Sequence, residues 1–250
     1  LIRREKVYLQ GISKSYIQKQ IDIVKSVDWL LPNSQMEMDA LNDRLGLSLK
    51  NYTVVNNAID SLMYDEIISD YRVSRKQDLI TFVARIDPRK NQLNFLKAMM
   101  DTDYRIRFIG NVFPQFQSYY DELKGIALER GNVEFISHLS QEDLFKHTME
   151  AKVNVLTSWI ETPGLVSLEA AYAGCNIVVS DKGSVRDYFK DYAFYCMPDN
   201  LESIKKATIE AMESEASSDL RDLIKQDYSW STTAEQTLNG YQSVLNNLKM

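Results

Sequence analysis

The segment Val153–Glu169 reads VNVLTSWIETPGLVSLE and predicts a strand that turns directly into a helix. Its first five residues are mostly apolar and rich in valine, as in a buried strand. Thr162 is a candidate N-cap, and Pro163 suits the first helical position because proline has no N–H group to leave unpaired there. Glu161 then lies just past the strand end, and Glu169 lies within the helix that follows.

This turn predicts a binding site for an anion. The free amides of Gly164 and Leu165 would face whatever lies above the strand end. A carboxylate on either side would accept hydrogen bonds from hydroxyl groups. Two glutamates at this spacing also occur by chance in acidic proteins. With the turn between them, they suit a molecule that carries phosphate between two hydroxyl-rich rings, which describes a nucleotide-sugar.

The composition is that of an ordinary globular protein. The chain has 250 residues, of which 44% are hydrophobic and 26% charged. No apolar run approaches the ~20 residues that span a bilayer. The net charge of −6 argues against a nucleic-acid partner, whose binding surface needs a basic stripe. The chain opens on Leu1 rather than methionine, and we expect it to begin inside a longer protein.

The two cysteines, Cys175 and Cys196, flank apolar runs and have no metal-ligand spacing. We expect both to be buried, unpaired thiols. Thiols of this kind favour a reducing, cytoplasmic location, with peripheral contact at the inner face of a membrane left open.

From about residue 78 the chain alternates short apolar runs with amphipathic segments. This alternation predicts a doubly wound, Rossmann-like α/β sheet whose parallel strands are covered on both faces. The predicted strands are Leu79–Val83, Ile106–Ile109, Val133–Ile136, Val153–Leu156, Ile177–Val179 and Ala193–Tyr195. The predicted helices between them are Gln92–Met100, Gln117–Arg130, Gln141–Glu150, Leu165–Ala173 and Val185–Phe189.

The flanking segments predict a second, incomplete domain. Helices are expected at Ser15–Val27 and Gln35–Leu45, with short strands at Trp29–Leu31 and Tyr52–Val55. Ser61–Lys76 is polar, lacks a clear apolar period, and is predicted to be a connector. We therefore expect residues 1–60 to be the tail of a preceding domain with its linker, 61–230 the sheet domain, and 231–250 a closing amphipathic helix.

Polar residues follow the ends of four predicted strands, where ligands bind in open α/β sheets. These are Arg85 and Lys90, Gly110 and Asn111, Ser137 and His138, and Glu161 with its helix turn. Arg85 and Lys90 could neutralise a diphosphate, although a solvated basic turn is the simpler interpretation of that loop alone. A loop histidine such as His138 is more often a surface or hydrogen-bonding residue than a catalytic one. The phosphate-binding glycine motifs, the serine elbow and metal-ligand clusters are missing from the sequence.

Four of these segments together resemble the carboxy-terminal half of a retaining glycosyltransferase of family 4, which has the GT-B fold. They are Phe82–Lys90, the Glu161–Glu169 pair, Leu168–Asp181, and Val54–Asp60, which is similar to the family's interdomain stretch. The resemblance covers about residues 25–245. Departures are Thr162 and Pro163 after the first glutamate, Ala84 for a commoner glycine, and Asn57 for the glycine of the interdomain turn.

The resemblance implies a role for each matching residue. Arg85 and Lys90 would bind the donor diphosphate and, with Glu161 on hydroxyls of the transferred sugar, form the catalytic set. Glu169 would accept hydrogen bonds from the ribose. The donor-binding set is completed by Thr162, Pro163, Gly164, Leu165 and Val166 around the phosphates and by His138 and Leu139 near the base.

By the same resemblance, the reaction is sugar transfer from a nucleotide-diphosphate sugar with retention of configuration, with no tightly bound cofactor and no essential metal. The acceptor would be a glycan or a lipid-linked saccharide. Most of the amino-terminal domain that would position this acceptor is missing, so we expect the chain alone to be inactive. If that domain is missing, an apolar stripe on the closing helix could drive self-association. In this family, membrane contact usually involves the amino-terminal domain. Two alternatives stay open: a non-catalytic nucleotide-sugar-binding subunit, and another GT-B enzyme such as a sugar-nucleotide epimerase.

Overall fold

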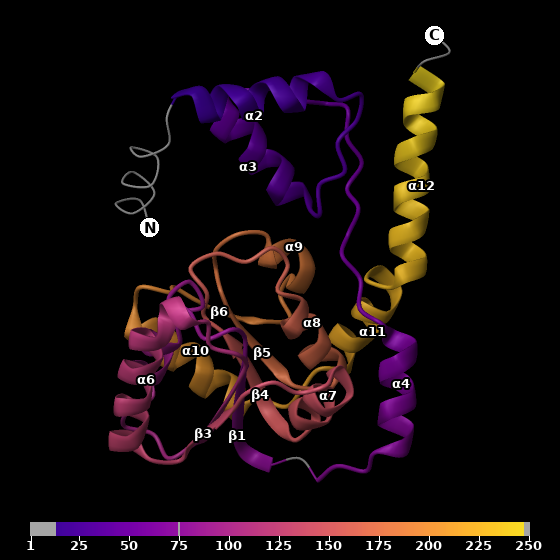
Figure 1. The fold of residues 1–250 in the computed structure, drawn as a ribbon. Helices are drawn as coiled ribbons and strands as arrows, with labels where there is room; N and C mark the ends of the chain where they lie inside the picture. Colours follow the sequence, from indigo (N-terminus) through magenta and orange to yellow (C-terminus); the bar gives the residue numbers. More distant parts are fainter. Residues whose placement is uncertain (1–13, 75, 248–250) are drawn as a thin grey trace. The chain divides into compact units, whose positions relative to one another are not determined.

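In the computed structural model, which describes residues 14–74 and 76–247, six parallel strands form one sheet in the order β3-β2-β1-β4-β5-β6 (Figure 1). This order confirms the predicted doubly wound α/β fold. Residues 79–83 and 153–156 of the two central strands are buried, because helices cover both of their faces. The strands are β1 Lys76–Val83, β2 Arg105–Ile109, β3 Val133–Ile136, β4 Ala151–Leu156, β5 Asn176–Ser180 and β6 Phe194–Cys196.

The helices around the sheet fall into two groups, one on each face, as Figure 1 shows. On one face lie α5 Gln92–Ala98, α6 Gln117–Arg130 and α10 Leu201–Glu213. On the other lie α4 Ser61–Asp70, α7 Gln141–Met149, α8 Leu165–Tyr172 and α11 Ser218–Asp227. The short η1 Pro114–Phe116 and α9 Val185–Phe189 complete this unit, which comprises residues 58–229.

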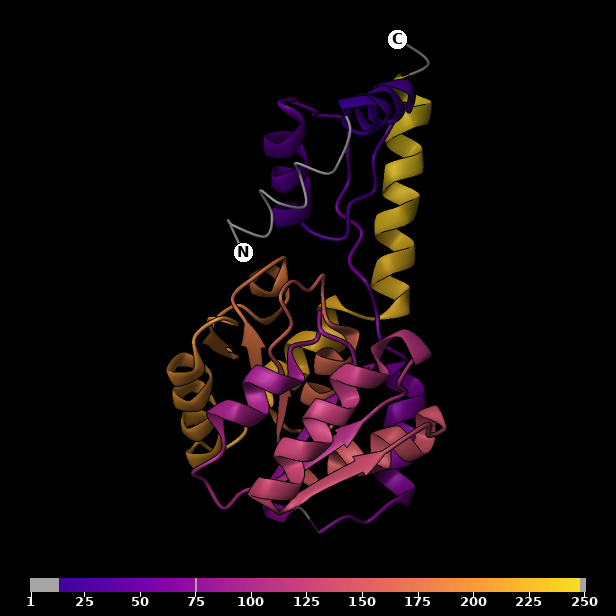
Figure 2. The same cartoon turned by 60° about the vertical axis from the view of Figure 1, so that its left-hand side comes forward.

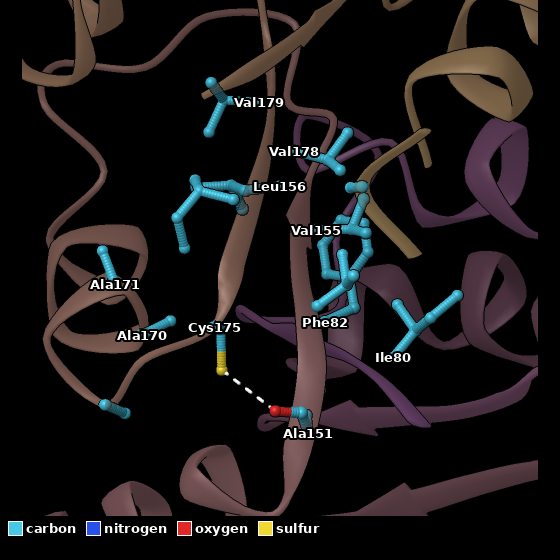
Figure 3. Close-up of a cluster of buried hydrophobic side chains, with 14 of the residues drawn as sticks. Ile80, Phe82, Ala151, Val155, Leu156, Ala170, Ala171, Cys175, Val178 and Val179 are labelled. Carbon is cyan, nitrogen blue, oxygen red and sulfur yellow. Dashed lines mark hydrogen bonds between the residues drawn. The ribbon is translucent and has the colours of Figure 1, made fainter. Parts of the chain in front are cut away.

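Both cysteines are free and buried, as predicted. Cys175 lies at the base of the aliphatic cluster between β4 and α8, where its thiol donates to the carbonyl of Ala151 at 3.4 Å (Figure 3). Burial raises the pKa of the Cys196 thiol to about 12. A buried thiol that stays protonated is unreactive, so Cys196 acts as a small hydrophobe, and the buried Cys175 packs among apolar side chains in the same way.

The predicted connector Ser61–Lys76 is wrong in its first part, because Ser61–Asp70 forms α4. Asp60 caps this helix by accepting a hydrogen bond from the amide of Met63 at 3.1 Å. The buried residues Tyr64 and Ile67, with the half-buried Ile68 and Tyr71, recur at helical spacing. The many charges between them obscured this period.

Helices α10 and α11 were not predicted. Their start signals are nevertheless local: the side chain of Asn200 accepts from the amide of Ser203, and that of Ser217 from the amide of Asp219. In α10 the buried Ile204, Ala207 and Ala211 recur at helical spacing. The signals for both helices were therefore present in the sequence.

The second unit contains the described residues before 58 and after 229. Its helices are α2 Lys14–Ser26, α3 Gln35–Leu45 and α12 Trp230–Asn247. Figure 2 shows α12 (yellow) as a long helix beside the extended segment that precedes residue 58, to which Thr233 and Gln236 are tied through Asn56. The two predicted short strands are reduced to one bridge between Leu30 and Tyr52. Pro32 explains this, because it has no N–H group to extend the ladder.

Three helices on one face of the sheet are joined through Asp65 of α4. Its carboxylate accepts hydrogen bonds from Tyr172 of α8 at 2.7 Å and from Lys225 of α11 at 2.8 Å. Burial alone would raise the pKa of Asp65, but these two hydrogen bonds outweigh it and hold the pKa below its ordinary value. The network therefore stabilises the fold while Asp65 is ionised.

We expect Asp65→Asn to lower stability near pH 7 by about 1 kcal/mol, a value discounted for a side chain that is 36% exposed. This corresponds to a fall of about 2–4 °C in melting temperature. Because the folded pKa lies below the unfolded one, the wild-type contribution is complete above about pH 4 and disappears as pH falls through the folded pKa. Melting curves from pH 7 to 2 should therefore converge for the two proteins. Asp222→Asn, an exposed change on the same α11, is the control, and parallel curves would contradict the assignment.

Candidate functional site

The loops that follow β1 and β4 meet at the point where the strand order reverses. In the order β3-β2-β1-β4-β5-β6, the strand order reverses between β1 and β4. In open α/β sheets, such a reversal is where the ligand crevice forms, at the carboxyl ends of the strands. Lys90 comes from the loop after β1 and Glu161 from the loop after β4. Lys90 Nζ donates a hydrogen bond to Glu161 Oε1, and the two side chains form an ion pair that is 17% and 12% exposed.

The loop that carries Lys90 is held by buried polar residues. Asp87 accepts from the amide of Arg89 at 2.9 Å, and its carbonyl accepts from the amide of Lys90 at 3.0 Å. The next residue, Asn91, adopts a positive φ of 66°, and its side-chain amide donates to the carbonyls of Thr157 and Pro198 at 3.0 and 2.7 Å. These bonds fix the backbone on both sides of Lys90, so its ammonium is aimed by the loop.

The Glu161 backbone is paired with the loop after β5. Its amide donates to the carbonyl of Lys182 at 3.3 Å, and its carbonyl accepts from the amide of Ser184 at 2.9 Å. Gly183 lies opposite with a φ of 87°, and a Cβ at this position would collide with the Glu161 carbonyl. This close approach requires glycine, so the loop after β5 determines where the Glu161 carboxylate lies.

Arg85 lies on the same loop as Lys90 but is more open, with 52% of its side chain exposed. Its guanidinium lies 5.7 Å from the centroid of the Phe113 ring and 3.7 Å from the carboxylate of Asp87. Gly110 joins the loops after β1 and β2, because it packs against the carbonyl of Ala84 where no side chain fits. Arg85 is therefore a solvent-accessible cation at the same edge of the sheet.

The predicted cap of the helix after Glu161 is wrong, although the predicted range Leu165–Ala173 has the right first residue. Thr162 does not cap the helix and Pro163 is not its first residue. The peptide bond between them is cis, and the helix begins at Leu165 with Gly164 as its N-cap, in a left-handed conformation with φ 79°. The reversal of the chain at Gly164 separates Pro163 from the helix. The first amides of α8 are those of Leu165 and Val166. Leu165 is 42% exposed, and Val166 is half-buried.

Glu169 lies one turn into α8 and is held by two neutral donors. Gln141, the first residue of α7, donates from Nε2 to Glu169 Oε1 at 3.0 Å and contacts the hydroxyl of Tyr64 at 2.6 Å. Burial raises the pKa of the Glu169 carboxyl, and hydrogen bonds from Tyr64 and Gln141 counter part of this rise. The carboxylate is thus partly desolvated and has no cation among these partners.

His138 and Leu139 lie in the loop between β3 and α7, with His138 exposed and Leu139 half-buried. The end of this loop reaches Glu169 through Gln141. Among residues 14–74 and 76–247, no group of three or more His, Cys, Asp or Glu side chains is placed to hold a metal ion.

Sequence reasoning missed two residues that contact Glu169, namely Tyr64 and Gln141. The sequence predicts Gln141 only as the start of a helix, and it places Tyr64 in the expected connector. The helical spacing of Tyr64 with Ile67, Ile68 and Tyr71 was a signal that could have placed Tyr64 on the face directed toward the sheet.

The chain belongs to the glycosyl transferases group 1 family, whose model matches residues 63–230. The match covers the whole sheet, from β1 to β6, with its helices. A curated relative is the O-antigen chain mannosyltransferase B of Escherichia coli, 23% identical over 176 residues, which are 66% of this chain and 46% of the relative. Another is the glycogen synthase of Mycobacterium tuberculosis, 24% identical over 234 residues, which are 88% of this chain and 55% of the relative. The chain thus spans about half the length of these curated relatives.

Solved structures share this fold at low sequence identity. HepE of Anabaena, in complex with UDP and glucose, has a TM-score of 0.76 and 16% identity, and the match covers 94% of this chain and 68% of that one. Sucrose-phosphate synthase of Thermosynechococcus elongatus has a TM-score of 0.80 and 16% identity, covering 95% and 63%. The Rossmann-like sheet is therefore that of GT-B glycosyltransferases. Within the part of the chain that the structure describes, no helix has the length and hydropathy to cross a membrane.

Proposed function

We propose that the carboxyl edge of the sheet is the donor site of a retaining, family 4 glycosyltransferase that uses a nucleotide-diphosphate sugar. The observation that carries this proposal is the pairing of Lys90 with Glu161 across the crevice between β1 and β4. A cation and a carboxylate side by side match a diphosphate joined to a hydroxyl-bearing sugar. HepE, which shares the fold, has been solved in complex with UDP-glucose, a ligand of this kind.

In this proposal each residue has one task. Lys90 and Arg85 bind the diphosphate, while the first amides of α8, at Leu165 and Val166, support a phosphate oxygen. Glu161 accepts hydrogen bonds from the transferred sugar, and Glu169 accepts them from the ribose. Thr162, Pro163 and Gly164 shape the turn between these two carboxylates, and the loop of His138 and Leu139 borders the base.

The proposed chemistry is a displacement on one face of the sugar. The bond between the anomeric carbon and the phosphate oxygen breaks, and the acceptor oxygen bonds to the same carbon from the same side. The acceptor proton passes to the leaving phosphate. Lys90 and Arg85 act by stabilising the negative charge that develops on this leaving group, so the proposal requires no metal.

The proposal also gives residues 1–60 and 231–250 a role as parts of an acceptor-side domain. The acceptor would be a glycan or a lipid-linked saccharide, in line with the polysaccharide-related names of the curated relatives. Because the donor edge alone does not position an acceptor, we propose that the 250-residue chain by itself transfers no sugar.

Calorimetric titration of the chain with UDP, GDP and ADP tests the donor site. We expect one of these nucleotides to bind selectively. Arg85→Ala should weaken that binding roughly tenfold or more, since it removes a charged hydrogen-bond donor. Arg89→Ala removes an exposed charge from the same loop and should leave the affinity unchanged. If none of the three nucleotides binds, or if the two variants behave alike, the proposed donor site is wrong.

A further inference from the structure

Three side chains from three different helices form a hydrogen-bonded trio at the ribose end of the proposed donor site. Tyr64 of α4, Gln141 of α7 and Glu169 of α8 are far apart in the chain and meet on one face of the sheet. The two contacts of Gln141 Nε2, with Tyr64 Oη at 2.6 Å and with Glu169 Oε1 at 3.0 Å, use both N–H groups of its side-chain amide. A hydrogen bond from the Tyr64 hydroxyl also lowers the pKa of the Glu169 carboxyl, against the rise that burial causes.

The trio has a rigid support. Tyr64 is 1% exposed, and its ring stacks on Phe145 of α7 with a centroid separation of 4.0 Å and an interplanar angle of 15°. Gln141 begins a helix whose N-cap, Ser140, accepts from the amide of Asp143 at 3.0 Å. The Tyr64 ring is thus fixed by packing, and the backbone of Gln141 is fixed by the capped start of its helix. A free glutamate side chain would have to lose its rotamer freedom on binding a ligand, whereas Glu169 has already lost it.

The charge of the trio restricts what it can bind. Glu169 is held by a hydroxyl and an amide, which leaves the carboxylate charge uncompensated by these partners. An uncompensated carboxylate repels phosphate and attracts neutral donors. It can accept about four hydrogen bonds, so two positions stay available after Tyr64 and Gln141 are satisfied. Two vicinal hydroxyls meet that requirement, whereas a deoxyribose supplies one donor fewer.

We propose that Tyr64 and Gln141 are positioning residues that orient the Glu169 carboxylate toward the ribose hydroxyls and thereby set the preference of the site for ribonucleotides over deoxyribonucleotides. This inference rests on the proposed function, because it needs the nucleotide in the donor site. It adds two residues to that site and assigns to the site a preference for ribonucleotides over deoxyribonucleotides. Neither residue contacts the reacting atoms.

The test compares the affinities of UDP and 2′-deoxy-UDP by calorimetry, with the corresponding GDP and ADP pairs if UDP does not bind. For the wild-type chain we expect the ribonucleotide to bind roughly tenfold tighter or more, since one hydrogen bond to a charged acceptor is lost in the deoxy form. Gln141→Ala and Tyr64→Phe should each reduce this ratio to about threefold or less. Tyr64→Phe keeps the ring that packs against Phe145, so it should remain folded. Glu169→Ala should bring the ratio to about one.

Gln117→Ala is the matched control, because Gln117 is also the first residue of a helix and bonds to a carboxylate, that of Asp121 at 2.9 Å. The ratio of ribonucleotide affinity to deoxyribonucleotide affinity should be the same in this control as in the wild type. If Gln141→Ala and Tyr64→Phe weaken both nucleotides equally, or change only the melting temperature, their role is structural and the inference is wrong while the donor site stands. If Glu169→Ala alone reduces the ratio, positioning by Tyr64 and Gln141 is again overturned. If no ribonucleotide binds the wild-type chain, the proposed function fails and this inference fails with it.

Discussion

Lys90→Ala is expected to weaken binding of the nucleoside diphosphate roughly 10- to 100-fold, whereas Glu161→Gln is expected to strengthen it roughly three- to tenfold. The reason is the ion pair between these two residues. A diphosphate that enters the crevice has to share the Lys90 ammonium with the Glu161 carboxylate, and both side chains are largely buried. Removing Lys90 leaves the carboxylate to repel the phosphates. Removing the charge of Glu161 leaves the ammonium free for them.

The effect of Glu161→Gln on binding affinity should reverse when the ligand carries a sugar. In the proposed site, Glu161 accepts hydrogen bonds from the sugar hydroxyls, and an amide accepts them less strongly than a carboxylate. We therefore expect this variant to bind the nucleotide-sugar more weakly than the wild type does. A variant that binds the nucleoside diphosphate more tightly and the nucleotide-sugar more weakly cannot owe both changes to a general loss of structure.

Calorimetric titration of the wild type and both variants measures these affinities. A second ion pair on the same fold, Lys97 with Glu122 at 3.2 Å, is 43% and 54% exposed and provides the control. Lys97→Ala and Glu122→Gln should leave both affinities unchanged. If Lys90→Ala and Glu161→Gln shift the diphosphate affinity in the same direction, the ion pair is not the phosphate site.

Gly183→Ala is expected to destabilise the sheet unit by about 2–4 kcal/mol and to weaken nucleotide-sugar binding. The new methyl group would meet the backbone carbonyl of Glu161, which is bonded to the loop after β5. The φ of 87° adds the strain of a left-handed conformation. The clash can be relieved only by moving one of the two backbones, which displaces the Glu161 carboxylate from Lys90.

Urea unfolding and titration with the nucleotide-sugar check this result. Gly131→Ala separates the two contributions, because Gly131 has a similar φ of 75° but open space around the added Cβ. We expect this control to lose about 1–3 kcal/mol through backbone strain alone, because its ψ is 178°, and to keep its affinity. Equal losses in the two variants would show that backbone strain alone accounts for the effect and that the contact with Glu161 is unimportant.

The fold class could be predicted because its signals are local. Val133–Ile136, Gln117–Arg130 and Val185–Phe189 have the predicted bounds, since apolar runs and helical spacing depend only on neighbours along the chain. The same kind of signal existed for α4, α10 and α11 in their caps and buried spacing, although dense surface charge obscured it. Pro163 misled the prediction for α8 because proline also suits the turn before a helix.

The order of residues along the chain is enough to predict the doubly wound sheet and the polar residues that follow its strands, including Arg85, Lys90, Glu161 and Glu169. Which of these residues are partners depends on how the elements pack in three dimensions. Lys90 and Glu161 are 71 residues apart, and Gln141 bonds to side chains 77 and 28 residues away. Such hydrogen bonds depend on strand order and on how helices pack against one face. Neither leaves a periodic trace along the chain, because each is a property of elements that meet only after folding.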